Sequence, residues 1–312
     1  MEARLWRMVY HIVRQIPHAK RPREQYSDRI ILLVLVWAAV WNRPVYWACN
    51  TTSWPAALRD LVPCLPEDST MSRRMKTLAF LQLLERTLRC LVDLIPPTLA
   101  KELDGMPMCV GGFSKDRDAK RGQAAGQMVR GYKLHLCAAG RLPKDFVLAP
   151  MNRHECVMAV DLIRRLSGEY GYAVCDNAFD TNELHEEAAK VGHQLVAPPR
   201  ACNQGVRDIK HNRPERIRSL DMLDSPLKHC GLACRVGHAT PDATPFARDL
   251  YNQRVAIESC FGELTAMGLG RLPNWVRRPR RVARWVSAVL IIYLTKNLAR
   301  RGLLPKSLHL RR

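Results

Sequence analysis

The chain has 312 residues, of which 47% are hydrophobic and 25% are charged. This composition excludes a disordered or fibrous protein, and the length suggests about two domains with proper cores. Lys and Arg number 49 against 29 Asp and Glu, so the formal net charge is +20, which favours a polyanionic partner, most commonly nucleic acid.

The cysteines and the apolar segments predict where in the cell the protein is located. The 11 cysteines are scattered through the chain, unlike those of a small disulfide-bonded secreted domain. The first residues lack the apolar core of a signal peptide, and the longest apolar run, Ile30–Trp41, is too short to span a bilayer. We therefore expect reduced thiols, a cytoplasmic protein and no membrane partner.

The first 97 residues are expected to form a helical, DNA-binding domain. Ser27 can cap an apolar helix that continues to Trp41, and two short helices are expected over 45–61. A long helix is predicted over 66–94, because the prolines that follow it cannot continue a helix.

This long helix would carry a basic cluster in its first turns. Short helices followed by such a helix are typical of helix-turn-helix DNA binding. Positive charge at a helix N-terminus is unfavourable to the helix dipole, which favours an external phosphate partner. A helical bundle without DNA contacts remains the alternative. The predicted DNA contacts in this region are Arg73, Arg74 and Lys76.

From about residue 98 to 298 the periodicity indicates a second, α/β domain. Its expected strands and helices alternate in an order that predicts a mixed sheet flanked by helices. The expected strands are 106–110, 132–138, 146–149, 172–175 and 194–197, and the expected helices are 154–166, 181–191 and 282–298.

Residues 200–248 differ from the rest of this domain, because they are basic and show little periodicity. We interpret them as an insertion with a phosphate-binding character. Its basic side chains include Arg207, Lys210, Arg213, Arg216 and Arg218. The last residues, 299–312, are expected to form a basic tail.

The segment Asp249–Leu264 is predicted to be one amphipathic helix. Tyr251, Arg254 and Glu258 follow one another at helical spacing, so they form a polar stripe beside the apolar face. A surface salt bridge between Arg254 and Glu258, worth about 0.3–0.5 kcal/mol, is the plain alternative.

Two further carboxylates are expected at strand ends. Asp104 precedes the strand 106–110, and Asp176 directly follows the strand 172–175, where α/β sheets place their sites. If the fold brings Glu258 to them, three carboxylates in a basic protein make a site for two hard cations that activate a phosphodiester. Mg²⁺ suits such a site, because it prefers carboxylates, water and phosphate oxygens.

Other polar residues are interpreted as structural. Asp180 and Glu183 are expected to cap a helix, and Asp116 to lie solvated in a turn. Trp275 is expected to be buried against the last helix, and stacking of Trp275 and the nearby arginines on DNA bases is the alternative. The spacing of four possible ligands does not favour zinc. These ligands are His229, Cys230, Cys234 and His238.

Five segments, in this order, resemble the DDE transposases of bacterial insertion sequences, of the family-four/five type with a ribonuclease-H-like catalytic core. The resemblance covers roughly residues 100–298 and, more loosely, the helical region before them. The segments are Asp104-Gly-Met-Pro-Met, Ser114-Lys-Asp-Arg-Asp-Ala119, Gly131-Tyr-Lys-Leu-His135, Asp176-Asn-Ala-Phe-Asp180 and Tyr251-x2-Arg254-x3-Glu258.

The resemblance implies a metal-binding catalytic triad of Asp104, Asp176 and Glu258. It further implies that Tyr251 and Arg254 contact DNA phosphates near the cut. By the same resemblance, Lys133 would lie beside the site and bind DNA.

The resemblance also implies the reaction. The protein would bind double-stranded DNA at the ends of its element, cleave a strand and transfer it to target DNA. Two Mg²⁺ ions, which Mn²⁺ can replace, would serve as cofactors. We expect a homodimer on DNA, because two ends must be joined, and a bacterial, nucleoid-associated location.

Two positions depart from the family pattern. Thr265 stands where a basic residue is usual, and Ala178 where glycine is common. They leave open a decayed transposase that binds DNA without cutting it. A structure-specific nuclease with the same ribonuclease-H-like fold is the other alternative, and it would cut DNA without joining it.

Overall fold

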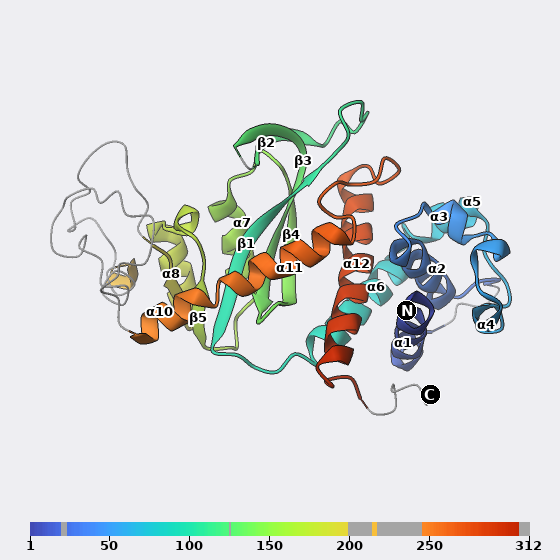
Figure 1. Ribbon diagram of the computed structural model, residues 1–312, viewed down its shortest axis with the longest axis horizontal. Helices are drawn as coiled ribbons and strands as arrows, with labels where there is room; N and C mark the ends of the chain where they lie inside the picture. The colour runs from blue at the N-terminus through green and yellow to red at the C-terminus, as the bar shows by residue number, and fades with distance from the viewer. Residues whose placement is uncertain (20–23, 125, 199–213, 217–244, 306–312) are drawn as a thin grey trace. The chain divides into compact units, whose positions relative to one another are not determined.

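The computed structural model describes residues 1–19, 24–124, 126–198, 214–216 and 245–305. The chain divides into two compact units, here called the helical unit and the sheet unit, whose elements are labelled in Figure 1. The helical unit comprises Met1–Pro96, Phe113–Asp116 and Leu264–Arg312, and the sheet unit comprises Pro97–Gly112 and Arg117–Glu263.

The helical unit contains the predicted N-terminal helices, which confirms the helical character of this region. Ser27 caps α2 as expected, since its hydroxyl accepts the N–H of Ile30 at 3.4 Å. The elements are α1 (Glu2–Gln15), α2 (Asp28–Val40), α3 (Val45–Ala48), η1 (Thr51–Ser53), α4 (Ala56–Arg59), α5 (Asp68–Arg74), α6 (Leu78–Val92) and α12 (Pro279–Arg300).

Three buried tryptophans form part of the core of this unit. The ring of Trp54 lies 5.2 Å from that of Trp6 and 4.9 Å from that of Trp37. Trp6 also donates to the carbonyl of Leu33 at 2.9 Å. These contacts join α1, α2 and the segment before α4, because each indole buries a large surface while its N–H finds an acceptor.

Helix α12 is the long apolar helix of the helical unit. It packs against α1, α2 and α6. Its length and composition would suit a membrane span, but 72% of its most apolar window is buried inside the protein, as in a core helix. The sequence analysis assigned this helix to the domain 98–298, whereas its packing places it with the N-terminal helices.

The long helix predicted over 66–94 is instead two helices, α5 and α6. The chain turns at residues 75–77, where the Thr77 hydroxyl accepts the N–H of Phe80 at 3.3 Å and caps α6. Arg73 and Arg74 therefore lie in the last turn of α5, where positive charge favours the helix dipole. The dipole argument for a phosphate partner was wrong.

Arg74 is occupied within the protein. Its guanidinium lies 2.7 Å from Asp28 and 3.0 Å from Glu24, and it donates to the carbonyl of Tyr26 at 2.9 Å. These bonds tie α5 to the start of α2, so they argue against the predicted DNA contact of Arg74. Arg73 and Lys76 stay predicted contacts.

Asp116 is buried, contrary to the expectation of a solvated turn. Its carboxylate accepts the backbone N–H of Arg278 at 2.8 Å. Arg278 has a φ of 72° directly before α12, a conformation that costs a non-glycine residue free energy. The buried carboxylate therefore holds the chain at the entry to α12.

The sheet unit confirms the predicted mixed sheet flanked by helices. The strands β4, β3 and β1 are antiparallel neighbours, and β5 and β6 continue the sheet parallel to β1. The strands are β1 (Ala100–Cys109), β2 (Lys120–Ala124), β3 (Gln127–Ala139), β4 (Leu142–Pro150), β5 (Gly171–Val174) and β6 (His193–Val196).

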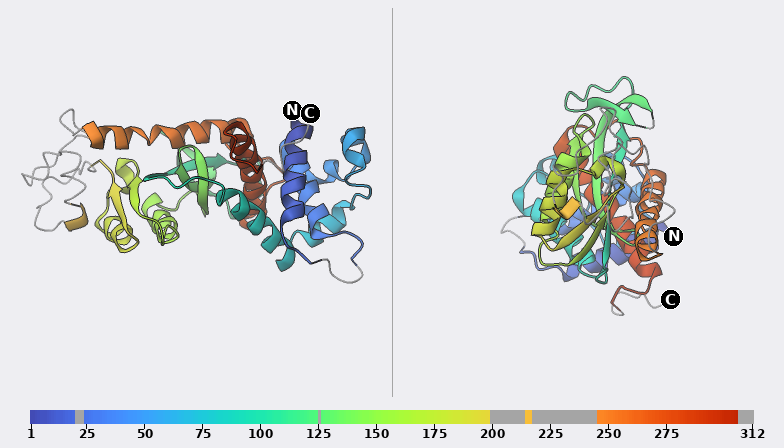
Figure 2. Two further views of the ribbon diagram at one scale, coloured as in Figure 1. Left: turned by 90° about the horizontal axis from the view of Figure 1, so that it is seen from below. Right: turned by 90° about the vertical axis from the view of Figure 1, so that its left-hand side faces the viewer.

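Helices cover both faces of this sheet. Alternate residues of a strand point to opposite faces. Ala173 and Leu195 belong to the core beneath α7 (Glu155–Arg164) and α8 (Asn182–Lys190), whereas Val174 and Val196 pack with Leu250. Leu250 lies on α10 (Pro245–Asn252), which follows the other face of the sheet (Figure 2).

The single helix predicted over 249–264 is interrupted. It is divided into α10 and α11 (Val255–Ala266) at Gln253 and Arg254. Hydrogen bonds of the i→i+3 type replace the helical pattern there, from the N–H of Arg254 to Tyr251 and from that of Ile257 to Arg254. The helix therefore tightens where the predicted polar stripe begins.

Candidate active site

Asp104 lies in β1, and Asp176 lies just beyond the end of the neighbouring strand β5. In the parallel pairing of β1 and β5, Glu102 lies opposite Val174, so the pairing brings Asp104 and Asp176 close together. Asp104 lies within β1 and not before it, because the strand begins at Ala100. Asp176 lies two residues beyond Val174, the last residue of β5, so the strand ends one residue earlier than predicted. The sheet thus brings two of the three predicted carboxylates together.

The backbone fixes both carboxylates. Asp104 accepts the N–H of Gly105 at 2.6 Å, and Asp176 accepts the N–H of Ala178 at 2.9 Å, which caps the short helix η2 (Asn177–Phe179). The methyl group of Ala178 packs against the core of the sheet unit. The departure from glycine at this position therefore leaves the bond to Asp176 in place.

These two carboxylates are partly buried, and burial disfavours their charged forms. Burial raises the pKa of Asp104 to about 7; the bond from Gly105 opposes the rise, whereas the charges of Asp176 and Glu155 add to it. Burial also raises the pKa of Asp176, and the charge of Glu155 adds to that rise. Positive charge brought to this edge of the sheet would be stabilised.

Arg254 connects Glu258 to this pair of carboxylates. Its guanidinium lies 2.6 Å from Glu258 and 4.0 Å from Asp104. The plain alternative, a salt bridge within the helix, is thus present, but Arg254 also reaches the sheet. The Glu258 side chain remains 49% exposed. It is held at the rim of the site by Arg254.

Tyr251 positions Arg254. Its ring is half-buried against the sheet, and the guanidinium carbon of Arg254 lies 5.9 Å from the ring centre. Burial raises the pKa of Tyr251, so the phenol stays protonated and can donate a hydrogen bond. The polar stripe predicted from the sequence therefore faces the site.

Lys133 and Glu155 form an ion pair beside Asp104. Their charged atoms are 2.6 Å apart. A Cβ added to Gly105 would lie 3.1 Å from the Lys133 side chain and 3.2 Å from the Glu155 carboxylate, so the pair abuts the backbone next to Asp104. Sequence analysis missed Glu155, because an acid in the first turn of a helix is usual without any site.

His135 and His154 have structural roles. His135 is buried with neither ring nitrogen hydrogen-bonded, and burial lowers its pKa to about 3. It is therefore neutral beside Gly105. His154 caps α7, since its Nδ1 accepts the N–H of Cys156 at 3.3 Å.

Asp180 does not cap α8, contrary to the prediction; Thr181 does. Asp180 is buried and receives two bonds from Arg216, at 2.7 and 2.6 Å. Arg216 was expected to bind phosphate and instead completes a buried ion pair. The other predicted phosphate ligands, Arg207, Lys210, Arg213 and Arg218, and the four candidate zinc ligands lie outside the described residues.

An open polar cavity of about 540 Å³ adjoins this site. Arg121, Lys133 and Arg153 line it, together with His154 and Glu155. Three cations surround one carboxylate there, so the cavity favours a polyanion.

The donor chemistry of the site fits a divalent cation. Carboxylate oxygens are the ligands that Mg²⁺ prefers, and burial together with neighbouring carboxylates raises the pKa of both Asp104 and Asp176, so a cation that joined them would favour their charged forms. No three His, Cys, Asp or Glu side chains in the described parts of the chain converge closely enough to hold an ion. Of the three predicted ligands, Glu258 is the one whose carboxylate does not join the other two, because it is paired with Arg254.

Comparison with known proteins identifies the family. Residues 68–295 match the family model described as the transposase DDE domain. A chain of the piggyBac transposase synaptic complex with hairpin DNA is 13% identical to this chain, with a TM-score of 0.47, and the match covers 96% of this chain and 73% of that chain. No curated protein sequence matches. Because the family model matches well over half of the sequence, the chain belongs to the DDE transposases, a family of metal-dependent phosphoryl-transfer enzymes.

Proposed function

We propose that this protein is an active insertion-sequence transposase of the bacterial family-four/five type. It binds the ends of its element, hydrolyses a phosphodiester and uses the freed 3′-hydroxyl to attack target DNA. The observation that carries this proposal is the pair Asp104 and Asp176, which the pairing of β1 and β5 brings close together and whose charged forms burial disfavours.

The predicted triad of Asp104, Asp176 and Glu258 would hold two Mg²⁺ ions, which Mn²⁺ can replace. When bound, the ions activate the attacking oxygen and stabilise the leaving one. Glu258 can join the two aspartates only if its ion pair with Arg254 opens. Opening releases the guanidinium, whose planar fork suits a DNA phosphate.

Double-stranded DNA would approach the site over basic side chains. Lys133, Tyr251 and Arg254 lie at the carboxylates, and Arg121 and Arg153 extend the positive charge along the adjoining cavity. In the helical unit Arg73 and Lys76 stay proposed contacts. Binding that rests on lysine and arginine releases counterions, so it weakens steeply with salt.

Two further properties follow from the reaction. Both ends of an element must be cut and joined together, so we propose that the protein acts as a homodimer on DNA. We also propose that it works in the bacterial cytoplasm, associated with the nucleoid where its substrate lies.

The first test is cleavage of a labelled duplex that carries the DNA flanking this gene. We expect cuts with Mg²⁺ or Mn²⁺, none with chelator, and none from Glu258→Gln. Glu85→Gln is the matched control, because Glu85 is exposed on α6 in the helical unit.

Each other result of this test selects an alternative. DNA binding without cuts by a folded protein would favour the decayed transposase. Cuts without joined products would favour a nuclease of the same fold.

Glu155 gives a pH-dependent prediction. Its charge raises the pKa of Asp104 and of Asp176, so Glu155→Gln lowers both. Because metal binding needs ionised carboxylates, cutting by the wild type should rise with pH up to about 7. In Glu155→Gln this rise should move to lower pH, by up to about one unit.

The measurement is the initial cleavage rate from pH 5.5 to 8.5 at fixed Mg²⁺. Glu186→Gln on α8 removes an equivalent charge away from the site and should leave the profile in place. A Glu155→Gln protein with an unmoved profile would show that Glu155 does not act on the carboxylates.

A further inference from the structure

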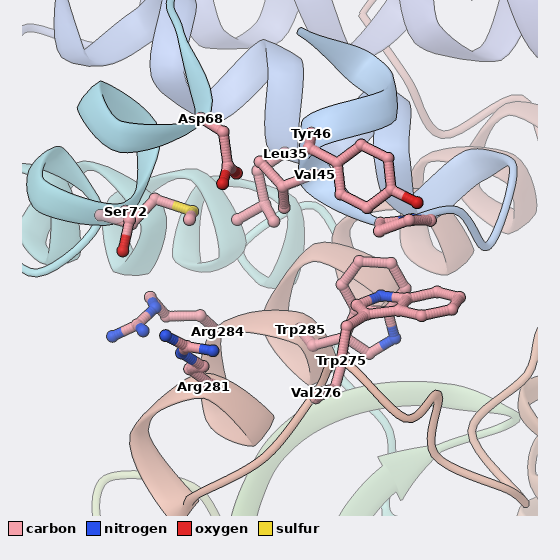
Figure 3. Close-up of a pocket in the computed structure, with 12 residues that line it drawn as sticks. Leu35, Val45, Tyr46, Asp68, Ser72, Trp275, Val276, Arg281, Arg284 and Trp285 are labelled. Carbon is pink, nitrogen blue, oxygen red and sulfur yellow. The ribbon is translucent and has the colours of Figure 1, made fainter.

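The helical unit contains a second site with the character of a ligand pocket. A cavity of about 200 Å³ is bounded by residues of α2, α3, α5, α12 and the segment before α12. Figure 3 shows the guanidinium groups of Arg281 and Arg284 together at one end, and the rings of Tyr46, Trp275 and Trp285 at the other. Asp68 faces the arginines from α5.

Arg284 indicates that an anion belongs in this pocket. It is 8% exposed, yet no carboxylate or hydrogen-bond acceptor within the described chain pairs with its guanidinium. Burial lowers its pKa, and the charges of Arg281 and Arg280 lower it further. A buried cation surrounded by cations is costly unless an anion joins it.

The aromatic wall indicates a planar group. Trp275 is 38% exposed and Tyr46 is 65% exposed. The prediction that Trp275 is buried against the last helix was therefore wrong, and both rings are open to a ligand. Trp285 is buried, and its indole N–H has no acceptor among the residues with a described position. The pocket thus offers ring faces and an unused donor next to two guanidinium groups.

We infer that this pocket binds one unpaired nucleotide of a DNA strand, with its phosphate on Arg281 and Arg284 and its base against Trp275 and Tyr46. The cavity is too small for a duplex but suits a single base. The carboxylate of Asp68, which also lines the pocket, can accept a hydrogen bond from a base amino group. The inference rests on DNA as the partner, as in the proposed function, but not on cleavage.

The test uses the full chain and separates the parts of the ligand. Binding is measured by fluorescence anisotropy of a labelled single-stranded oligonucleotide, and by competition with a deoxynucleoside monophosphate, a deoxynucleoside and inorganic phosphate. We expect the monophosphate to compete better than either of its parts. Trp275→Leu should weaken single-strand binding about tenfold, because base stacking on an aromatic ring contributes that much.

Arg281→Gln should weaken binding and reduce its salt dependence by about one counterion. Arg281 and Trp275 are exposed, so the variants at these two positions are expected to fold. A substitution of the buried Arg284 would be expected to disturb folding and is not used. The controls are Trp41→Leu, an exposed tryptophan outside the pocket, and Arg89→Gln, an exposed arginine on α6. Both controls should bind as the wild type does.

The results that would overturn this inference differ from those that would refute the proposed function. Single-strand binding unchanged in both pocket variants would overturn the inference even if the protein cuts DNA. Inorganic phosphate competing as well as the monophosphate would also overturn it, because the pocket would then be an anion site alone. A protein that never cuts DNA, but whose pocket variants lose single-strand binding, would refute the proposed function and leave the inference standing.

Discussion

Asp104→Asn is expected to abolish DNA cutting and, at the same time, to stabilise the metal-free protein. Loss of a charged ligand should lower the cutting rate by about 10³-fold or more, since bound metal supplies several kcal/mol of charge stabilisation. Asn keeps an oxygen that can accept the N–H of Gly105, so the strand should be undisturbed. DNA binding, which rests on the basic side chains, should be retained.

The stability gain follows from the sign of the pKa shift. Burial raises the pKa of Asp104 from 3.8 to about 7 in the folded protein. Folding at a pH above 7 must therefore keep a charge that burial disfavours, whereas below 3.8 the group is neutral in both states. Asp104→Asn should thus raise the free energy of unfolding by about 1–3 kcal/mol above pH 7, with the gain vanishing toward pH 3.8.

The measurement is chemical denaturation in chelator at pH 8 and pH 4.5, beside cleavage in Mg²⁺. Asp176→Asn should also raise the free energy of unfolding at pH 8 and lower the cutting rate, because the pKa of Asp176 is raised as well. Glu258→Gln should lose cutting without the gain in stability, since Glu258 is half-exposed and paired with Arg254. Cutting that persists in any of the three would remove that residue from the triad.

The succession of strands and helices along the sheet unit was predictable, because most of its strands carry their own signal in the sequence. Short β-competent runs mark β3, β4, β5 and β6, and turns and helices separate them, so the pattern alone predicted the mixed sheet. β2 was missed, because Lys120–Ala124 has no apolar alternation and pairs only through its backbone. Asp176 was placed correctly, since a carboxylate after a buried strand marks the edge where sites form.

The helix interruptions could not be seen in the sequence. Residues 253–254 carry no proline or glycine, and a turn of i→i+3 bonds preserves nearly the same side-chain spacing as a helix. At residues 75–77 the signal was present, because Thr77 is a favourable N-cap, but the apolar spacing on either side concealed it. The error mattered, since it reversed which helix end carries Arg73 and Arg74.

The partners of charged side chains were the least predictable part. Arg74 pairs with Asp28, which is 46 residues away in the sequence, and Arg216 pairs with Asp180, which is 36 residues away. Helical spacing reveals a pair such as Arg254 and Glu258, but nothing local distinguishes an arginine for DNA from one for a buried carboxylate. Glu155 was missed for the same reason, because its effect on Asp104 depends on the fold.

Asp180→Ala is expected to destabilise the protein strongly, by about 3–5 kcal/mol, because it leaves Arg216 as a buried charge without its partner. His185, 3.3 Å from the same carboxylate, would lose its contact as well. Removal of a helix cap, the role first predicted for Asp180, would cost only about 1 kcal/mol. The free energy of unfolding measured in urea therefore separates the two roles.

The matched control is Asp161→Ala, which removes an exposed aspartate from α7 and should cost little. Asp180→Leu combined with Arg216→Met should recover much of the loss, because two apolar side chains leave no charge to compensate. Equal costs for Asp180→Ala and Asp161→Ala would contradict a stabilising role for the pair. Since Asp180 follows Asp176 by four residues through the short helix η2, its loss should also loosen the backbone that positions Asp176. Folded Asp180→Ala protein should therefore cut more slowly, while Asp161→Ala should cut at the wild-type rate.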